Sequence, residues 1–407
     1  MSTLEVSALF DPRRMRAYPR IALAVYLVAA IMLAASSRNL VDSLGKPLGY
    51  DFITFWSASR LTLDGRPTAA FDFNAIGAAQ RVAVPASKKL FLWHYPPTYQ
   101  LLIAPLALLP YVPSYFIFIG ITLLGYLVLV RRLLDLPDAY VLILAYPATF
   151  ICAFHGQNSF ISAALFAGAI LSMVGAPLTA GLCFGLLAFK PQLGLLVPIA
   201  LIAARQWRIL AICGLTVIAY AGLSTLVFGL DLWRAFLGNS IVVRLVLEQA
   251  MLPWDKMPTA FVFLRLLGLP AWFAYSAQAA TALVAALAVV VVWRRCGATY
   301  LTGATLVAAT LLVSPYLFDY EMAMLAIPLA ILASDMTRWN CKKWERIGLL
   351  ILYLSPALMV PIAESTRLQA GFPALVLALV ICVRRALAAH PQKAEELTAS
   401  ESTAGRE

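Results

Sequence analysis

Polar side chains that could do chemistry lie in a few short stretches between long apolar runs. The first stretch is a loop, residues 37–97, which follows the first apolar run and carries Asp51. Tyr50 and Phe52 flank this aspartate, and Trp56 follows closely. A carboxylate beside aromatic rings at a membrane interface is partly desolvated, and desolvation favours proton uptake, as a general base requires. A solvated aspartate in an ordinary loop remains the alternative interpretation.

The same loop ends in the segment Trp93-His94-Tyr95-Pro96-Pro97. Each proline fixes its own φ angle and restricts the residue before it, so the segment is predicted to be rigid and extended. It would present His94 and Tyr95 just above the lipid boundary. The alternative is an interfacial anchor whose prolines stop a helix.

A second polar group is the tetrapeptide His155-Gly156-Gln157-Asn158. An imidazole and two amide side chains around a glycine offer several hydrogen-bonding groups, which suit sugar hydroxyls. The alternative is a simple helix cap between two spans, a role for which Asn158 is well suited.

A third polar group is Lys190-Pro191-Gln192, which interrupts two hydrophobic runs. A lysine in such a place is costly unless it faces water or an anion. A lysine that extends to the interface from a proline-broken turn is the alternative. Asp319, Tyr320 and Glu321 form a comparable group at another span end, where a polar helix cap would have the same composition.

Composition places these groups in a membrane protein. The chain has 407 residues, of which 62% are hydrophobic and 13% charged, and its mean hydropathy is +0.84. A soluble protein carries about 25% charged residues. Repeated apolar runs long enough to cross a hydrocarbon core of about 30 Å predict an all-α polytopic membrane protein.

The formal net charge of +11 does not indicate nucleic-acid binding, because the basic residues punctuate the ends of the apolar runs. The six cysteines are scattered, without the spacing of a disulfide framework or a zinc site. Neither a phosphate-binding glycine loop nor a paired-histidine motif occurs. We therefore expect no metal and no cofactor, and soluble nucleotide sugars and ATP are poor candidate ligands.

The positive-inside rule then orients the chain, with both termini cytoplasmic and about twelve spans. The predicted spans are residues 21–36, 111–130, 139–154, 159–174, 178–189, 193–204, 209–228, 271–293, 299–317, 322–332, 347–363 and 372–383. The apolar segment 98–109 is too short and too proline-rich to be counted among them. With this topology the basic clusters fall inside, and the polar groups described above fall outside.

One transmembrane domain, residues 1–388, is expected, followed by a disordered cytoplasmic tail, residues 389–407. Its large first outer loop, residues 37–110, should contain two short interfacial helices, residues 52–63 and 71–84, lying on the membrane surface. A second outer loop covers residues 229–270. Three cations of this second loop could meet a phosphate or a lipid head group: Arg234, Arg244 and Lys256.

Several short motifs, taken in order, resemble those of glycosyltransferase family 87. They are Asp51-Phe52-x-x-Phe55-Trp56, Leu63-Asp64-Gly65, Tyr95-Pro96-Pro97, the run from Pro105 to Pro110, Gly156-Gln157-Asn158, the run from Gly185 to Gly194, and the stretch from Ser314 to Glu321. Each motif is modest alone, but their order and spacing are specific. The resemblance extends to about Leu332.

The resemblance implies a GT-C architecture and a polyprenyl-phosphate mannose donor used at the outer membrane face. It also implies an inverting transfer with an aspartate of the first outer loop as general base, and that aspartate corresponds to Asp51. Two departures concern the donor contacts. The family often has Tyr-Asp-Leu where this chain has Tyr320-Glu321-Met322, and some members have a histidine at Tyr316.

These considerations give a mechanistic hypothesis. Asp51 accepts the proton of an acceptor hydroxyl, which attacks the anomeric carbon, and the leaving lipid phosphate needs positive charge or hydrogen-bond donors. The residues expected to bind the donor or its phosphate are Lys190, Gln192, His155, Gln157 and Asn158. The residues expected to line the acceptor or the sugar are His94, Tyr95, Trp56, Tyr320 and Glu321.

The expected partners are a polyprenyl-phosphate sugar, a lipid or glycan acceptor and membrane lipids, and the expected location is a bacterial inner membrane. A ligase or polymerase of lipid-linked glycans would share the topology and the lipid donor. A transporter or flippase would place its ionisable groups at mid-membrane within an internal repeat. The polar groups here gather at one face and no repeat is visible, which favours the enzyme.

Overall fold

The computed structural model describes residues 12–43 and 45–404, without the side chains of residues 12, 15 and 389–404. The described residues form helices, turns and two isolated β-bridges, with no strand. The predicted all-α class is therefore confirmed. The predicted disordered tail, residues 389–407, falls where side chains or whole residues lie outside the description, and it stays a prediction.

Contacts divide the chain into two compact units. The first comprises Met1–Ala164, Ala188–Lys190 and Ala219–Met251, and the second comprises Leu165–Leu187, Pro191–Ile218 and Leu252–Glu407. Three helices contribute residues to both units: α9 (Ser159–Ser172), η3 (Leu187–Phe189) and α13 (Trp207–Phe228).

The other helices belong to one unit each. Those of the first unit are α2 (Pro12–Ser36), α3 (Phe52–Leu63), η1 (Pro67–Phe71), α4 (Phe73–Ala83), α5 (Pro97–Ile103), η2 (Ala104–Leu108), α6 (Tyr111–Arg131), α7 (Ala139–Leu144), α8 (Pro147–Phe154), α14 (Leu230–Gly238) and α15 (Ser240–Glu248). Those of the second unit are α10 (Pro177–Leu186), α11 (Pro191–Gly194), α12 (Leu196–Ala203), η4 (Trp254–Lys256), α16 (Ala260–Leu266), α17 (Ala271–Cys296), α18 (Tyr300–Thr310), η5 (Asp319–Leu325), α19 (Ala326–Arg338), α20 (Lys343–Thr366) and α21 (Gly371–Ala404).

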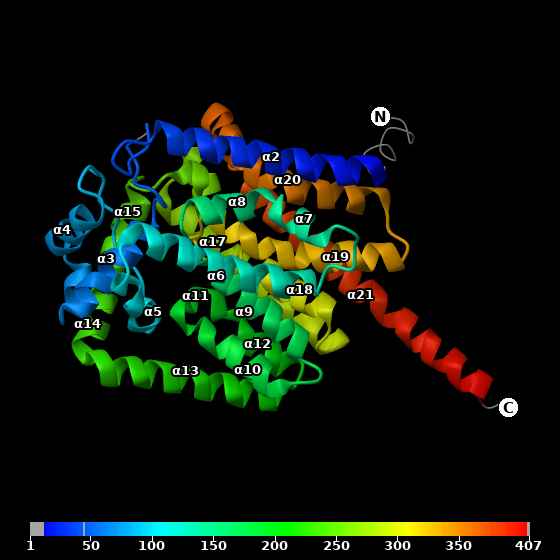
Figure 1. Ribbon diagram of the computed structural model, residues 1–407. Helices are drawn as coiled ribbons and strands as arrows, with labels where there is room; N and C mark the ends of the chain where they lie inside the picture. The colour runs from blue at the N-terminus through cyan, green and yellow to red at the C-terminus, as the bar shows by residue number, and fades with distance from the viewer. Residues whose placement is uncertain (1–11, 44, 405–407) are drawn as a thin grey trace. The chain divides into compact units, whose positions relative to one another are not determined.

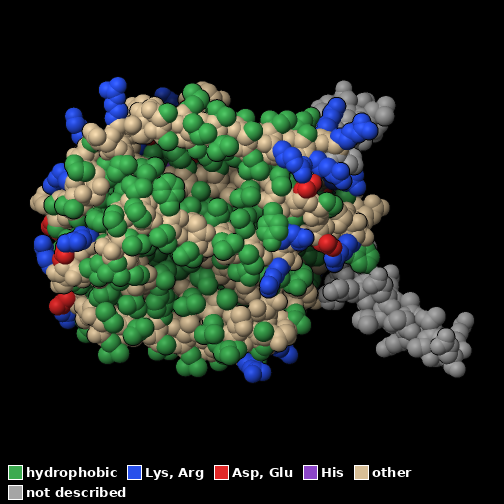
Figure 2. All heavy atoms as spheres, in the orientation of Figure 1, with side chains coloured by type: hydrophobic (Ala, Val, Ile, Leu, Met, Phe, Trp, Pro, Cys, Tyr) green, Lys and Arg blue, Asp and Glu red, His purple; other side chains and the backbone are tan. Residues whose placement is uncertain are grey.

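Seven helical stretches among the described residues are long and apolar enough to cross a membrane. They are Arg16–Ser36, Tyr111–Arg131, Trp207–Phe228, Ala271–Cys296, Asp319–Arg338, Lys343–Thr366 and Gly371–Ala388. Five further apolar helices have 10–17 residues. Hydrophobic side chains also cover most of the face shown in Figure 2. The structure supports a membrane protein, whereas the count of twelve spans stays a prediction.

One predicted span, residues 139–154, is broken in the structure. Tyr146 has an extended backbone (ψ 122°), and Pro147 is the first residue of α8. A proline disfavours the helical conformation of the residue before it, so α7 ends and a new short helix begins. In Figure 1, α2 runs beside α7, where the Tyr26 ring stacks on Phe150 of α8 at 4.7 Å.

Helix α3 is the centre of the first unit. Its bounds match the prediction, but its position differs from the expected surface helix, because nine of its twelve residues are buried. One of its buried polar side chains, Ser59, bonds to the backbone of η2. The Ser59 hydroxyl donates to the carbonyl of Ala104 at 2.7 Å and accepts from the amide of Ala107 at 2.8 Å. The expectation of a surface location was therefore wrong for this helix.

In the second unit, α18 packs against α17, α19 and α21. All nine residues from Thr302 to Thr310 are buried, and a Cβ at Gly303 would lie only 2.8 Å from the side chain of Ile170. Gln278 of α17 ties three backbone groups together: its carbonyl oxygen accepts from Phe261 at 3.1 Å, and its amide donates to Leu312 at 2.9 Å and Val313 at 3.0 Å.

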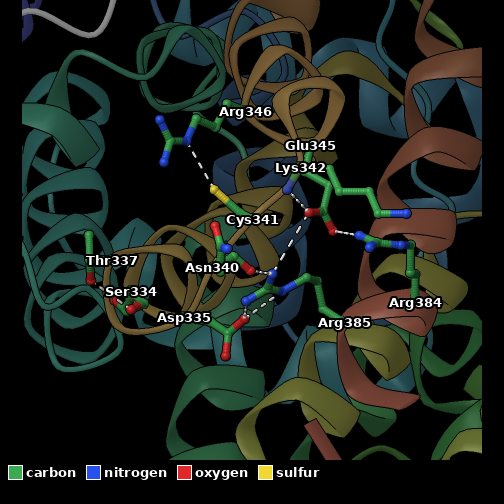
Figure 3. A network of polar contacts seen from close by, with 10 residues as sticks. All are labelled: Ser334, Asp335, Thr337, Asn340, Cys341, Lys342, Glu345, Arg346, Arg384 and Arg385. Atoms are coloured by element: carbon green, nitrogen blue, oxygen red, sulfur yellow. Dashed lines mark hydrogen bonds and ion pairs between the residues drawn. The ribbon is translucent and has the colours of Figure 1, made fainter. Parts of the chain in front are cut away.

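A buried charge network joins the end of α19, the start of α20 and the middle of α21 (Figure 3). Arg385 donates to Asp335 at 2.7 Å and to the carbonyl of Asn340 at 2.8 Å. Its guanidinium also lies 3.7 Å from Glu345, a fully buried carboxylate that pairs with Arg384 as well. Charges inside a protein are tolerated when they are paired and hydrogen-bonded, which is the case here.

Candidate active site

A tight turn presents Asp51 at the start of α3. Gly49 has φ 72° and Tyr50 has φ 39°, and a Cβ on Gly49 would lie 2.6 Å from the ring of Tyr115. The amide of Asp51 then donates to the carbonyl of His155 at 3.1 Å. Asp51 occupies the N-cap position, yet its side chain makes no capping bond to the helix. Its carboxylate is therefore directed to other partners.

Tyr50 is held on the opposite side of this turn. Its hydroxyl donates to Asp42 at 2.7 Å, its ring stacks on His155 at 5.1 Å, and Lys46 lies 4.6 Å from the ring centroid. Burial is the main cause that raises the pKa of Tyr50, followed by the bond to Asp42 and the charges of Asp42 and Asp51. Tyr50 is consequently a neutral phenol that anchors the turn.

Gly156 allows the turn between α8 and α9 to approach Asp51. It has φ 63°, and a Cβ there would lie 2.5 Å from the Cβ of Phe52 and 2.6 Å from the carbonyl oxygen of Gly49. Only glycine fits a left-handed position this close to another backbone. The two glycine-containing turns are thus packed directly against each other.

Gln157 connects this second turn to the carboxylate. Its Nε2 donates to Oδ2 of Asp51 at 2.9 Å, while its Oε1 accepts from the amide of Asn158 at 3.3 Å. The hydroxyl of Tyr95 donates to the same Oε1 at 3.4 Å. Because donors face the oxygen and an acceptor faces the nitrogen, the orientation of this amide is fixed.

Asn158 contacts a charge of the opposite sign. The ammonium of Lys190 donates to its Oδ1 at 2.9 Å, and the same ammonium lies 5.8 Å from the centroid of the Tyr95 ring. The Lys190 side chain is only 4% exposed, which excludes the interpretation of a lysine extended to the interface. A buried ammonium is well suited to an anionic ligand.

Two consecutive amide side chains therefore hydrogen-bond to a carboxylate and to an ammonium. Gln157 donates to the anion Asp51, and Asn158 accepts from the cation Lys190. Such a pair of groups can remove a proton from one reactant and stabilise negative charge on another. Among the residues that the structure describes, no group of three or more His, Cys, Asp or Glu side chains is arranged to hold a metal ion.

The other predicted residues of the first unit have different surroundings. The Trp56 indole donates to the carbonyl of Leu109 at 3.0 Å and is buried, so it serves the packing of α3. His155 contributes its carbonyl and the stack on Tyr50. His94 points to Asn239, whose Nδ2 lies 2.9 Å from its Nδ1.

Three predicted site residues belong to the second unit. Gln192 lies on the short helix α11. Glu321 accepts from the amide of Phe318 at 2.9 Å, as a helix-capping carboxylate does, and Tyr320 stacks on the Phe318 ring at 5.3 Å. The Glu321 contact is that of the polar helix cap, which was the alternative interpretation of this group.

Sequence reasoning missed three residues that shape the site. Asp42 anchors Tyr50, Tyr115 confines Gly49, and Asn239 holds His94. No local pattern marks them, since each acts through a partner distant in sequence or placed by an irregular turn.

Comparisons with known proteins bear on the same region. A sequence model of glycosyltransferase family 87 matches residues 93–315, which are 223 of the 407 residues. The matched region includes Tyr95, Gln157, Asn158 and Lys190, and it begins after Asp51. No curated protein and no solved structure matches the chain.

Proposed function

Since the chain belongs to glycosyltransferase family 87, we propose that it moves a hexose from a polyprenyl-phosphate donor to a hydroxyl group of a lipid or glycan acceptor. The donor sugar is mannose in this proposal, and the transfer takes place at the outer membrane face. The protein is a glycosyltransferase and carries several apolar helices typical of a membrane protein. The nature of the donor and the acceptor is the part that is proposed.

The observation that carries the proposal is the pairing of Gln157 with Asp51 and of Asn158 with Lys190. An inverting displacement needs a base on the side of the nucleophile and positive charge on the side of the leaving group. One dipeptide contacts a group of each kind. A lipid-linked phosphate is itself a good leaving anion, so a cation suffices and no general acid is needed.

The proposed reaction proceeds in one displacement. The acceptor oxygen attacks the anomeric carbon and transfers its proton to the carboxylate of Asp51. The bond between the anomeric carbon and the phosphate oxygen breaks on the opposite side, and the released polyprenyl phosphate carries the electron pair. Lys190 stabilises the negative charge that develops on that oxygen, while Gln157 keeps the plane of the Asp51 carboxylate fixed.

The proposal includes a GT-C architecture with about twelve spans, counting the short apolar helices together with the long ones. The Asp51 turn would face the periplasm of a bacterial inner membrane, with both chain termini in the cytoplasm. A lipid-linked donor diffuses in the bilayer, so a site at the membrane surface can receive it without a soluble nucleotide sugar.

The test is sugar transfer by the purified protein in detergent, with radiolabelled polyprenyl-phosphate mannose as donor and native membrane lipids as acceptors. Asp51→Asn should lower the transfer rate by at least about a hundredfold while donor binding is retained, because the general base is lost. Asp64→Asn is the matched control, since Asp64 is an exposed aspartate paired with Arg60 at 3.2 Å.

Lys190→Gln is the second informative variant. It should weaken donor binding and lower the transfer rate by about a hundredfold, because an electrostatic partner of the phosphate is removed. Transfer that survives in Asp51→Asn would place the base elsewhere. Transfer of a whole glycan instead of one sugar by the wild type would identify a ligase or polymerase, and donor binding without transfer by any variant would contradict the proposed reaction.

A further inference from the structure

Asn239 lies at the junction of α14 and α15, where it ends the first helix and precedes the second. It is 7% exposed, and its side chain reaches the segment that precedes Tyr95. Its Nδ2 donates to the carbonyl of Trp93 at 3.2 Å and lies 2.9 Å from Nδ1 of His94. One amide group thus contacts two neighbouring residues of the first loop.

The Trp93 carbonyl fixes which way this amide points. A carbonyl oxygen can only accept, so the atom of Asn239 that faces it must be the nitrogen. The same nitrogen faces the imidazole of His94 and has a second hydrogen to donate. Nδ1 of His94 must therefore accept a hydrogen bond, and the proton of the neutral ring is on Nε2.

The surroundings of His94 keep the ring neutral. Burial lowers its pKa to about 4, so at neutral pH the imidazole carries one proton. The donor from Asn239 acts in the same direction, because an N–H that points at Nδ1 opposes protonation of that atom. Burial therefore keeps the His94 ring neutral, and the contact with Asn239 puts its single proton on Nε2.

The backbone explains why His94 has this partner. The rings of Trp93 and Tyr95 contact each other at 5.1 Å, so they lie on one side of the extended segment. Alternate side chains of an extended chain point to opposite sides. Tyr95 is directed to Gln157, and His94 is directed to the α14–α15 junction.

We propose that Asn239 is a positioning residue of the transfer reaction, which holds His94 as a neutral imidazole with its proton on Nε2. The consequence is that His94 offers a hydrogen-bond donor to a substrate oxygen and cannot serve as a base at Nε2. The proposal rests on the proposed function for the role of His94 toward a substrate. The protonation state follows from contacts that do not depend on it.

Helices α14 and α15 have the composition of helices that lie at a membrane surface. Both are amphipathic, with exposed apolar residues such as Leu237 and Ile241 (64% and 66% exposed) beside the ion pairs Arg234–Asp231 and Arg244–Glu248. Such helices lie in the interface of a bilayer. Asn239 therefore links these two helices to His94. A sugar hydroxyl or a phosphate oxygen of a lipid-linked substrate would reach His94 from the bilayer surface.

The protonation state can be measured without substrate. The full chain in detergent, labelled with ¹⁵N-histidine, contains three histidines, and the His94→Gln variant identifies the His94 signals by their loss. At neutral pH the wild type should show Nδ1 unprotonated and Nε2 protonated. Asn239→Asp should move the proton to Nδ1, because a carboxylate accepts. Asn239→Leu should give a mixture of the two forms.

Ser240→Ala is the control, and it should leave the His94 signals unchanged. A protonated Nδ1 in the wild type would overturn the proposal, as would an unchanged proton position in Asn239→Asp. These results do not require transfer activity. If the wild type transferred no sugar, that result would count against the proposed function. The histidine signals would still show whether the inferred protonation state of His94 is correct.

Transfer assays then test the donor role. Asn239→Asp should lower kcat/KM at least tenfold, because Nε2 loses its proton, and Ser240→Ala should not. His94→Gln retains a side-chain N–H and should keep more activity than His94→Ala by about tenfold. Equal loss in the two His94 variants would contradict a donor role, since a base is removed equally by both.

Discussion

Gln157 gives Asp51 its defined orientation. Its amide nitrogen donates to this carboxylate, and its carbonyl oxygen accepts from the backbone amide of Asn158 and the hydroxyl of Tyr95. A hydrogen bond to a charged group contributes about 1.5–3 kcal/mol. Loss of this hydrogen bond should therefore free the carboxylate to turn, although the amide transfers no proton itself.

A glutamate at position 157 would change the chemistry while keeping the shape. Gln157→Glu places a second carboxylate in contact with Asp51, and two such groups share a proton. The acid limb of the pH profile of kcat/KM should move to higher pH, with at least tenfold lower activity at pH 6. Assays between pH 5 and 9 would measure this.

Gln249→Glu is the control, since Gln249 is exposed at the end of α15 and gains the same charge. Its pH profile should match the wild type. An unshifted profile in Gln157→Glu would show that Asp51 is not the group whose ionisation limits the rate.

The residues with ionisable side chains could largely be identified from the sequence, and their partners could not. Asp51 and Lys190 stand out because charges are rare between apolar runs. Asn239 did not, because its hydrogen bond to His94 connects positions 145 residues apart and depends on how two segments fold together. The functional meaning of Glu321 was likewise ambiguous until its capping bond was visible.

The turn between α8 and α9 and the turn before α3 act as one structural element. Gly156 and Gly49 both have positive φ angles, and each lies where a side chain would meet the other turn or Tyr115. The short contact between them is what brings the carbonyl of His155 within reach of the Asp51 amide. The position of the carboxylate therefore depends on two glycines rather than on a helix.

Replacing the second of these glycines should displace the carboxylate. Gly156→Ala combines a strained φ angle with a Cβ 2.5 Å from that of Phe52, which should destabilise the protein by about 2 kcal/mol or more. We expect a lower thermal midpoint in detergent and at least tenfold less transfer per folded molecule. Differential scanning fluorimetry and the transfer assay would measure both.

Gly175→Ala is the matched substitution, because a Cβ at Gly175 would meet nothing within 4 Å. It should leave stability and transfer close to wild type. Equal behaviour of the two alanine variants would mean that the close approach at Gly156 is not needed.

Most long apolar helices were predicted well, including α20, which continues through Pro356 and Pro361. The bounds of α3 agree with the sequence, since a continuous run of helix-compatible residues ends at Asp64-Gly65. Its burial could not be predicted, because Thr54, Ser57 and Ser59 suggested a polar face. The apolar run 139–154 predicts one span, whereas Pro147 divides it into two short helices.

At the scale of the whole chain, the buried charge network is expected to contribute to stability. Arg385 lies between Asp335 and Glu345, and Glu345 is fully buried (Figure 3). Arg385→Ala leaves this carboxylate with one partner fewer and should destabilise the protein by about 3–5 kcal/mol. Arg346→Ala removes an exposed arginine nearby and should have little effect. Thermal unfolding in detergent would compare them.

A double variant separates the pair from its surroundings. Glu345→Gln combined with Arg385→Gln removes both charges and should recover part of the stability lost in Arg385→Ala. A double variant whose loss of stability equals the summed losses of Glu345→Gln and Arg385→Gln would show that the charges are not coupled.

The proposed orientation predicts which loops a membrane-impermeant thiol reagent can reach. Lys88 is exposed in the first loop, and Lys88→Cys should react in intact cells. Cys341 precedes α20 and is half-exposed, and it should react only after the membrane is permeabilised. Reaction of Cys341 in intact cells would reverse the topology and place the Asp51 turn in the cytoplasm.

The charge network of Figure 3 also bears on the order in which α20 and α21 enter the membrane during synthesis. Glu345 is at the beginning of α20, while Arg384 and Arg385 are on α21, which is synthesised later. Until α21 arrives, Glu345 is a carboxylate whose two arginine partners do not yet exist. The hairpin of α20 and α21 should therefore be integrated as a unit, and a chain truncated before Arg384 should be held back at the insertion machinery or degraded.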